Sequence, residues 1–293
     1  MSRTNPGHEP SLSSLLWGLT ILGFLLLPCR VAHAASHELS FGVLSQRSAV
    51  LTAEYWNPIL EHVSRQVGIP LNLQTARTAP ETNQAIERGA YDLVYSNTIF
   101  QPRMLKEGYQ VILKPRSNAI RGQLVALEES DIRAAKDLAN QTVGFPSRGA
   151  FVGYAVPMDH LLRATIPVQP VFGGNQEGIM GQLKARKVVA AGVNDEVMRL
   201  FAQRENLRYR VLWESEPFEN LPIAAHPRVK PDLVAAIRQA FATMPEDPEG
   251  MKILETAAQV IKQSPPLGFR PSRQADYQNY IGFYQTTLVQ DYE

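Results

Sequence analysis

The feature that most constrains the fold is an alternation of short apolar runs with amphipathic stretches. Leu39 to Leu44 is typical of a buried strand, and the next stretch, Ala53 to Val67, places its apolar residues on one helical face. Leu71 to Gln74 predicts a second strand, a helix is expected to end near Arg88-Gly89, and Leu93 to Tyr95 predicts a third strand. Strands and helices that alternate at these lengths predict a parallel βαβ sheet with right-handed crossovers.

A similar unit recurs later in the chain. The stretch Gln84 to Tyr95 is matched by Gln182 to Ala191, in which Val188 to Ala191 is the predicted strand. Polar residues follow both strands, Ser96-Asn97 in the first unit and Asn194-Asp195 in the second. The chain therefore predicts two related α/β lobes, with chance similarity of two short units as the alternative.

Two further apolar segments, Gly122 to Leu127 and Leu221 to Ala225, bracket the second unit and have no helix of their own. We expect them to be the extended strands by which the chain crosses between the lobes and returns. On this interpretation the first lobe holds residues 37–121 and 222–293, and the second lobe holds residues 122–221.

The N-terminal segment predicts export. Leu15 to Pro28 is an apolar run of about 14 residues, shorter than the roughly 20 that span a bilayer, and the triplet Ala32-His33-Ala34 follows it. Residues 1–34 are therefore predicted to be a signal peptide cut after Ala34, with an uncleaved membrane anchor as the alternative. Lipid attachment at Cys29 is disfavoured because Pro28 stands where a lipobox needs a small residue.

Charge and cysteine content exclude several partner classes. The chain has 29 Lys and Arg against 28 Asp and Glu, and loss of residues 1–34 would leave the mature chain neutral. A neutral chain with dispersed charges gives no reason to expect nucleic acid or an anionic membrane surface as partner. Cleavage also removes the single cysteine, so the exported protein must be stabilised by its core rather than by disulfides.

Polar residues gather where the carboxyl ends of the predicted strands would meet, which is where open α/β sheets bind ligands. The four segments are Ser45 to Ser48, Ser96 to Thr98, Pro146 to Ala150, and Asn194-Asp195. The third follows the predicted strand Thr142 to Phe145 and opens a predicted helix, whose N–H groups and positive dipole suit an anion. Arg148 could add a bidentate partner, although an ordinary capped helix with an exposed arginine is the alternative.

Several motifs stand in an informative order along nearly the whole mature chain. They are LSFGVLSQRSA, WNPILEHVSRQVG, AIERGAYDLVYSN, DLANQTVGF, GYAVPM, GGNQEG and GF…ADY. In this order they resemble the phosphonate, phosphite and phosphate-type periplasmic solute-binding proteins of ABC transporters. The resemblance implies a type II periplasmic-binding-protein fold, an α/β architecture of two lobes with hinge strands and a central ligand cleft that closes over the solute.

The resemblance carries over to the site residues unevenly. Such proteins usually hold an oxyanion with Ser or Thr hydroxyls just before the glycine that matches Gly153, where this chain has Ala150, Phe151 and Val152. The histidine often found in the segment that matches GGNQEG is Asn175 here, whereas the acidic residue is retained as Asp195. The predicted ligand-binding residues are Gln46, Tyr95, Ser96, Asn97, Ser147, Arg148, Ala150, Phe151, Val152, Asn175 and Asp195.

The predicted function is a periplasmic solute-binding protein that captures a small oxyanion for an inner-membrane ABC permease. The alternative is a ligand-sensing subunit of the same fold that signals to a membrane histidine kinase, which the divergent anion site favours. An enzyme is disfavoured, because the chain has no G-x-S-x-G motif and its mature histidines, His37, His62, His160 and His226, are isolated in the sequence. We expect a monomer without a catalytic residue, cofactor or metal.

Overall fold

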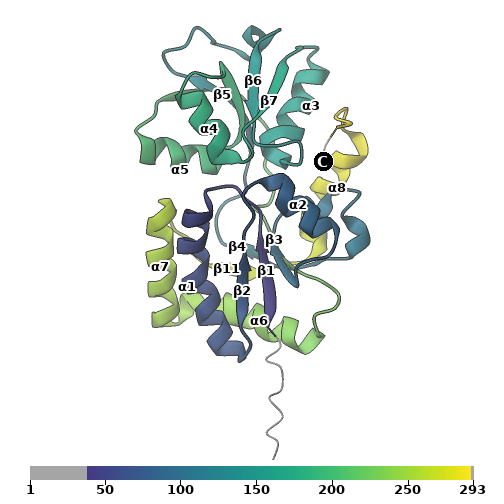
Figure 1. Cartoon of the computed structure of the whole chain (residues 1–293), viewed down its shortest axis with the longest axis vertical. Helices are drawn as coiled ribbons and strands as arrows, with labels where there is room; N and C mark the ends of the chain where they lie inside the picture. Colours follow the sequence, from purple (N-terminus) through teal and green to yellow (C-terminus); the bar gives the residue numbers. More distant parts are fainter. Residues whose placement is uncertain (1–37, 292–293) are drawn as a thin grey trace, which may run out of the picture. The chain divides into compact units, whose positions relative to one another are not determined.

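Two β-sheets, each with helices packed on it, make up residues 38–291, which are the residues that this computed structural model describes (Figure 1). The signal peptide predicted for residues 1–34 lies outside this range. Within residues 38–291 there is no helix with the length and apolar character needed to cross a membrane.

The first sheet has six strands in the order β11-β4-β10-β3-β1-β2. They are β1 (Leu39–Val43), β2 (Leu71–Gln74), β3 (Leu93–Tyr95), β4 (Gln110–Pro115), β10 (Ile223–Ala225) and β11 (Phe269–Pro271). Strand β1 pairs in parallel with both β2 and β3, whereas β10 runs antiparallel between β3 and β4. The three strands predicted in the first unit and their parallel pairing are confirmed.

Four helices pack on the first sheet and form, together with it, what we call the first lobe. They are α1 (Ala49–Val67), α2 (Ala79–Glu87), α6 (Pro231–Thr243) and α7 (Pro248–Ile261). Helix α1 begins before the predicted start at Ala53, because Ser48 caps it by accepting the N–H of Leu51 at 3.3 Å. It ends at Gly68, whose φ of 70° is the left-handed conformation of a helix C-cap. Figure 1 shows α1 and α7 running side by side.

The second sheet, in the order β7-β6-β8-β5-β9, forms the second lobe with α3, α4 and α5. Its strands are β5 (Gly122–Leu127), β6 (Thr142–Phe145), β7 (Gln169–Phe172), β8 (Ala190–Asn194) and β9 (Tyr209–Glu214). Its helices are α3 (Val156–Arg163), α4 (Gln176–Lys184) and α5 (Asp195–Glu205). The parallel order β7-β6-β8 repeats the order β2-β1-β3 of the first sheet, so the two lobes contain the same βαβαβ unit.

The second repeat differs from its prediction at one strand. The sequence predicts a strand from Val188 to Ala191, but β8 starts at Ala190 and continues to Asn194. After α4 the chain turns through Arg186, whose φ is 58°, and its pairing with β6 begins only where Ala190 lies opposite Val143. The prediction was wrong because apolar character alone does not separate the end of a turn from the start of a strand.

Side chains of both sheets alternate between two buried faces. In β3, Leu93 packs in the core beneath α1 and α6, whereas its neighbour Val94 packs in the core on the opposite face. The middle strand of each parallel trio, β1 in β2-β1-β3 and β6 in β7-β6-β8, also carries a glycine at a close helix or loop contact. A Cβ on Gly42 would lie 2.3 Å from the ring of Tyr91, and one on Gly144 would lie 2.3 Å from Ile179. Both glycines are therefore required by packing.

The chain passes between the two sheets twice, from β4 to β5 and from β9 back to β10. The two crossing segments pair with each other at Ile120 and Phe218, whose backbone N···O distances are 2.7 and 2.8 Å. The segments Gly122 to Leu127 and Leu221 to Ala225 were expected to be the crossing strands, but they contain β5 and β10, the first strand after each crossing. The division of the chain into two separately moving lobes at these positions stays a prediction.

The C-terminal end contacts the second lobe, although the predicted division assigns residues 222–293 to the first. After α8 (Gln278–Thr286), the hydroxyl of Thr287 and the N–H of Leu288 donate to the carboxylate of Asp159 at 2.9 and 2.7 Å. Arg163 donates to the carbonyl oxygen of Thr286 at 2.6 Å. Asp159 and Arg163 belong to α3, so the last described residues connect α8 to the second lobe.

Candidate functional site

Hydrogen bonds join loops of the first lobe directly to loops of the second. The backbone N–H of Glu177, at the start of α4, donates to the carbonyl oxygen of Gln46 at 3.1 Å, and its carboxylate accepts the N–H of Ser48 at 3.1 Å. Gln101 of the first lobe donates to the carbonyl oxygen of Gly149 of the second at 3.0 Å. Both lobes also line two cavities.

The first cavity has a volume of about 60 Å³. One water needs roughly 10–15 Å³ of such space. From the first lobe, Arg47 lines it in the loop after β1, Tyr55 and Trp56 line it from α1, and Tyr95 lines it from the end of β3. The second lobe contributes Asn194 at the end of β8. The space is therefore suited to a small solute with polar groups and an apolar part.

The guanidinium of Arg47 and the phenols of Tyr55 and Tyr95 keep their protons at neutral pH. Burial raises the pKa of Tyr55 to about 12 and raises the pKa of Tyr95 further, with Arg47 lowering both to a smaller extent. Burial lowers the pKa of Arg47, but a guanidinium stays protonated in proteins. The phenol hydroxyls thus remain possible donors, and that of Tyr55 already donates to Oε1 of Gln263 at 3.1 Å.

The second cavity is smaller, about 20 Å³, and lies beside the start of the helical segment that leads into α3. Gln46 and Asn97 line it from the first lobe, and Ala150, Val152 and Gln176 line it from the second. The Oε1 of Gln176 accepts the N–H of Asn194 at 3.1 Å, so the amide nitrogen of Gln176 is the group that remains free to donate. The volume corresponds to one or two waters.

A family model settles the kind of protein. The model for the ABC transporter, phosphonate, periplasmic substrate-binding protein matches residues 41–277, which is most of the chain. This chain belongs to that family. The family is periplasmic and consists of transport proteins rather than enzymes, and its members bind small phosphonates and work with ABC permeases.

Solved structures of the family have the same fold. A binding protein component of an ABC phosphonate transporter from Pseudomonas aeruginosa has a TM-score of 0.71 at 17% identity, covering 84% of this chain and 86% of that chain. PhnD1 from Prochlorococcus marinus in complex with methylphosphonate has a TM-score of 0.73 at 12% identity, covering 84% and 97%. The predicted type II periplasmic-binding-protein fold is confirmed. No curated protein sequence matches the chain.

Six of the residues predicted from the sequence line one of the two cavities. They are Gln46, Tyr95, Asn97, Ala150, Phe151 and Val152. The ring of Phe151, however, is 2% exposed and stacks on Tyr280 with centroids 4.2 Å apart. Its aromatic side chain thus fills the core beside α8, in a position where the family usually has a hydroxyl. Phe151–Ala155 forms a π-helical turn, a feature frequent at functional sites.

Three predicted residues have structural partners instead of a place in either cavity lining. The guanidinium of Arg148 pairs with Asp291 and lies 4.8 Å from the centre of the Phe172 ring. Asn175 caps α4 by accepting the N–H of Gly178 at 2.7 Å. Asp195 accepts the N–H of Arg121 at 2.8 Å, and burial raises the pKa of its carboxyl. Their role in binding stays a prediction.

The two predicted serines are buried but also lie outside the cavity linings. The hydroxyl of Ser96 lies 2.8 Å from that of Thr98 and accepts the N–H of the same residue at 3.1 Å. The hydroxyl of Ser147 is buried and has no hydrogen-bond partner among residues 38–291. The hydroxyl of Ser96 therefore stabilises the loop that contains Ser96 and Thr98. The hydroxyl of Ser147 has no acceptor in this range, and Ser147 follows Pro146, which lines the second cavity.

The list of predicted ligand-binding residues lacks Arg47, Tyr55, Trp56 and Asn194, which line the first cavity. Arg47 and Asn194 lie in the segments Ser45 to Ser48 and Asn194-Asp195 that the strand-end rule selected, so that rule could have found both. Tyr55 and Trp56 lie on α1, where an aromatic residue on an apolar helical face is expected to be packing. No sequence signal separates such a residue from one that also faces a cavity.

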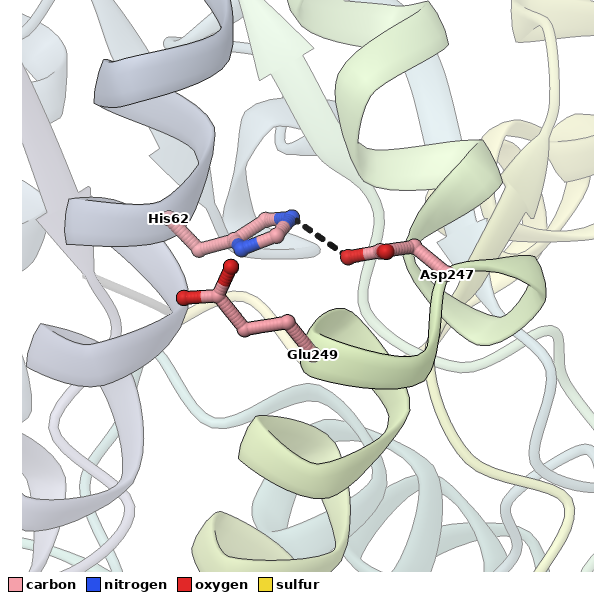
Figure 2. A group of neighbouring side chains, drawn as sticks. All are labelled: His62, Asp247 and Glu249. Carbon is pink, nitrogen blue, oxygen red and sulfur yellow. Dashed lines mark ion pairs between the residues drawn. The ribbon is translucent and has the colours of Figure 1, made fainter.

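Figure 2 shows a second group of ionisable side chains, in which His62 of α1 faces Asp247 and Glu249 at the start of α7. One atom from each lies within 4.8 Å of the others, a spacing that could hold a metal ion. Asp247 already caps α7 by accepting the N–H of Gly250 at 2.8 Å, and Glu249 accepts from Arg65 at 2.7 Å. Helix packing accounts for both carboxylates.

Proposed function

We propose that this protein captures a small oxyanion of the phosphonate, phosphite or phosphate type between its lobes and delivers it to an inner-membrane ABC permease. The observation that supports this most is the first cavity, where loops from both sheets enclose polar side chains in a chain of this family. Binding between the lobes would couple occupancy to the contacts of Gln46 and Ser48 with Glu177.

The alternative is a sensor subunit that reports to a membrane histidine kinase. Its support is the replacement of the usual hydroxyls by Ala150, Phe151 and Val152. The family match does not favour it. Permease and ATPase genes beside this gene would support transport, whereas a histidine kinase gene would support the sensor.

Export is part of the same proposal. The apolar run Leu15 to Pro28 and the triplet Ala32-His33-Ala34 support a signal peptide that is cut after Ala34 and releases a monomer into the periplasm. The binding experiment is therefore best done on protein recovered from the periplasm, whose N-terminal sequence also tests this cleavage position.

Thermal unfolding with a panel of anions tests the proposed function. A ligand that binds only the folded state at 100 times its Kd adds about 2.7 kcal/mol to the free energy of unfolding, which raises Tm by roughly 5–10 °C for a chain of this size. The panel should contain phosphonates, phosphite, phosphate, arsenite, sulfonates and small carboxylates. We expect a shift with at least one oxyanion. Absence of a shift with every member would contradict oxyanion capture.

A further inference from the structure

Arg47 differs from every other partly buried cationic side chain of residues 38–291. Each other lysine or arginine of residues 38–291 that is at least partly buried bonds a carboxylate or a carbonyl oxygen. Lys114 pairs with Glu219 at 2.9 Å, for example, and Arg204 pairs with Glu177 at 2.8 Å. Arg47 is partly buried and has no hydrogen bond or ion pair with any residue of this range.

The carboxylates near Arg47 already bond other groups. Glu177 is the carboxylate that acts most strongly on it, but Glu177 pairs with Arg204 and accepts the N–H of Ser48. Glu196, which lines the same cavity, pairs with Arg199 at 2.8 Å. The first cavity therefore has an excess positive charge, which is the guanidinium of Arg47.

An uncompensated charge in this position is costly for the folded protein. Burial penalises the charged form of Arg47, as its lowered pKa shows, and a guanidinium cannot escape the cost by losing its proton. An anion that enters the cavity would supply the missing partner, and a guanidinium can bind a carboxylate or phosphonate through two parallel hydrogen bonds.

We propose that Arg47 receives the negative charge of the solute, and that the solute is a small organic oxyanion whose carbon body packs on Tyr55, Trp56 and Tyr95. This inference rests on the proposed function and places the anion on the first lobe, opposite the missing hydroxyls at 150–152. The aromatic wall is continuous, since the rings of Trp56 and Tyr95 have centroids 4.9 Å apart. Inorganic phosphate has no apolar part to use this wall.

The second lobe supplies a polar contact to the same solute. The Oδ1 of Asn194 caps α5 by accepting the N–H of Val197 at 3.0 Å, so its amide nitrogen remains as a donor in the lining of the cavity. The volume of about 60 Å³ is suited to a small solute. Ethylphosphonate and propionate are suitable probes, because they share a short carbon body and differ in the oxyanion head.

Calorimetric titration of wild type, Arg47→Gln and Arg47→Lys with ethylphosphonate, propionate and inorganic phosphate tests the inference. We expect wild type to bind at least one organic anion more tightly than phosphate, and Arg47→Gln to bind it about 10- to 150-fold more weakly. Arg47→Lys should fall between the two, because a lysine retains the charge but loses the paired donors. Arg238→Gln, on the exposed surface of α6, is the matched control and should bind like wild type.

The unfolding temperature without ligand separates a binding role from a structural one. Because Arg47 has no partner in the folded protein, Arg47→Gln should unfold at the same or a higher temperature than wild type. A lower Tm without ligand would show that Arg47 is structural and would overturn the inference. Equal affinity of Arg47→Gln and wild type would overturn it too. Failure of the proposed function is distinct, since wild type itself would then bind no oxyanion.

Discussion

Asp92 joins three parts of the first lobe through one carboxylate. Its Oδ2 accepts the N–H and hydroxyl of Ser40 in β1 at 2.8 and 2.7 Å, and its Oδ1 accepts Nε of Arg228 at 2.6 Å. Burial alone would raise the pKa of Asp92, but the hydrogen bonds from Arg228 and Ser40 outweigh it and hold the pKa below 3.8. The lowered pKa means that the carboxylate form stabilises the fold.

Asp92→Asn should lower the free energy of unfolding by about 1–3 kcal/mol at pH 7, because the amide replaces a charged acceptor of several hydrogen bonds. A lowered pKa contributes stability that is present above the pKa of the unfolded chain and is lost as the pH falls through the folded value. The difference in free energy of unfolding between variant and wild type should therefore become smaller well below pH 3.8. Urea unfolding at pH 7 and at the lowest pH that keeps wild type folded measures this difference.

The control for this prediction is Glu255→Gln, which changes an exposed carboxylate on α7. It should leave the free energy of unfolding unchanged at both pH values. A gap for Asp92→Asn that is equally large at both values would show that the effect is not due to the charge of the carboxylate.

Two arginines show what the sequence could reveal about the site and what it could not. Arg148 was predicted to hold the anion because its segment connects a strand to a helix, and the structure places it in the turn between β6 and the helical segment Phe151–Ala155. Whether the guanidinium is free depends on Asp291, far away in the sequence, and that residue pairs with it. Arg47 is available for the opposite reason, since Glu177 bonds elsewhere. Such competition between distant side chains has no local signal.

At the scale of elements, Asp247 makes two different contacts at the start of α7. Asp247 accepts the N–H of Gly250 at 2.8 Å and also lies 3.6 Å from Nε2 of His62 on the neighbouring α1 (Figure 2). The first contact is a helix cap and the second is an interaction between helices. Two substitutions can separate them, because asparagine can cap a helix but carries no charge.

Asp247→Ala should lower the free energy of unfolding by about 1–2 kcal/mol, the usual value of an N-cap. Asp247→Asn should recover most of that loss if the cap dominates, as the shorter contact indicates. Urea unfolding of the two variants and wild type measures both values. An asparagine variant as unstable as the alanine variant would show instead that the charge facing His62 is the larger contribution.

Most elements could be predicted from the sequence because their signals are local. The strands of the first unit follow from short apolar runs, and the parallel pairing follows from the helices between them. The exact start of β8 could not be predicted, since it depends on the turn at Arg186 and on pairing with Val143. The position of residues 287–291 could not be predicted either, because it depends on Asp159 in a different lobe.

At the scale of the whole molecule, Glu177 connects the two lobes. It bonds Gln46 and Ser48 of the first lobe and Arg204 of the second. The two-lobed fold could be predicted from the repeat of its sequence units. The contacts of Glu177 could not be predicted, because they form only where loops of two sheets that are separate in the sequence meet.

Glu177→Ala should separate the lobes of the ligand-free protein, because it removes the bond from the carboxylate of Glu177 to the N–H of Ser48. Small-angle X-ray scattering should therefore give a larger radius of gyration for the variant than for wild type. Solute affinity does not isolate this role, because the variant also removes the carboxylate that acts most strongly on Arg47. Glu129→Ala, which breaks an exposed ion pair with Arg186, is the control and should leave the radius unchanged. An unchanged radius in Glu177→Ala would contradict a closing role for Glu177.

Trp56, which lines the first cavity, has one further consequence. Indole emission shifts in colour and intensity with the polarity around the ring, and a solute that displaces water from the cavity changes that polarity. Trp213, the second tryptophan of residues 38–291, lies in β9 and stacks on His160 with ring centroids 4.2 Å apart, away from the cavity lining. On the proposed binding in the first cavity, the emission of Trp56 is therefore expected to report occupancy without an added dye.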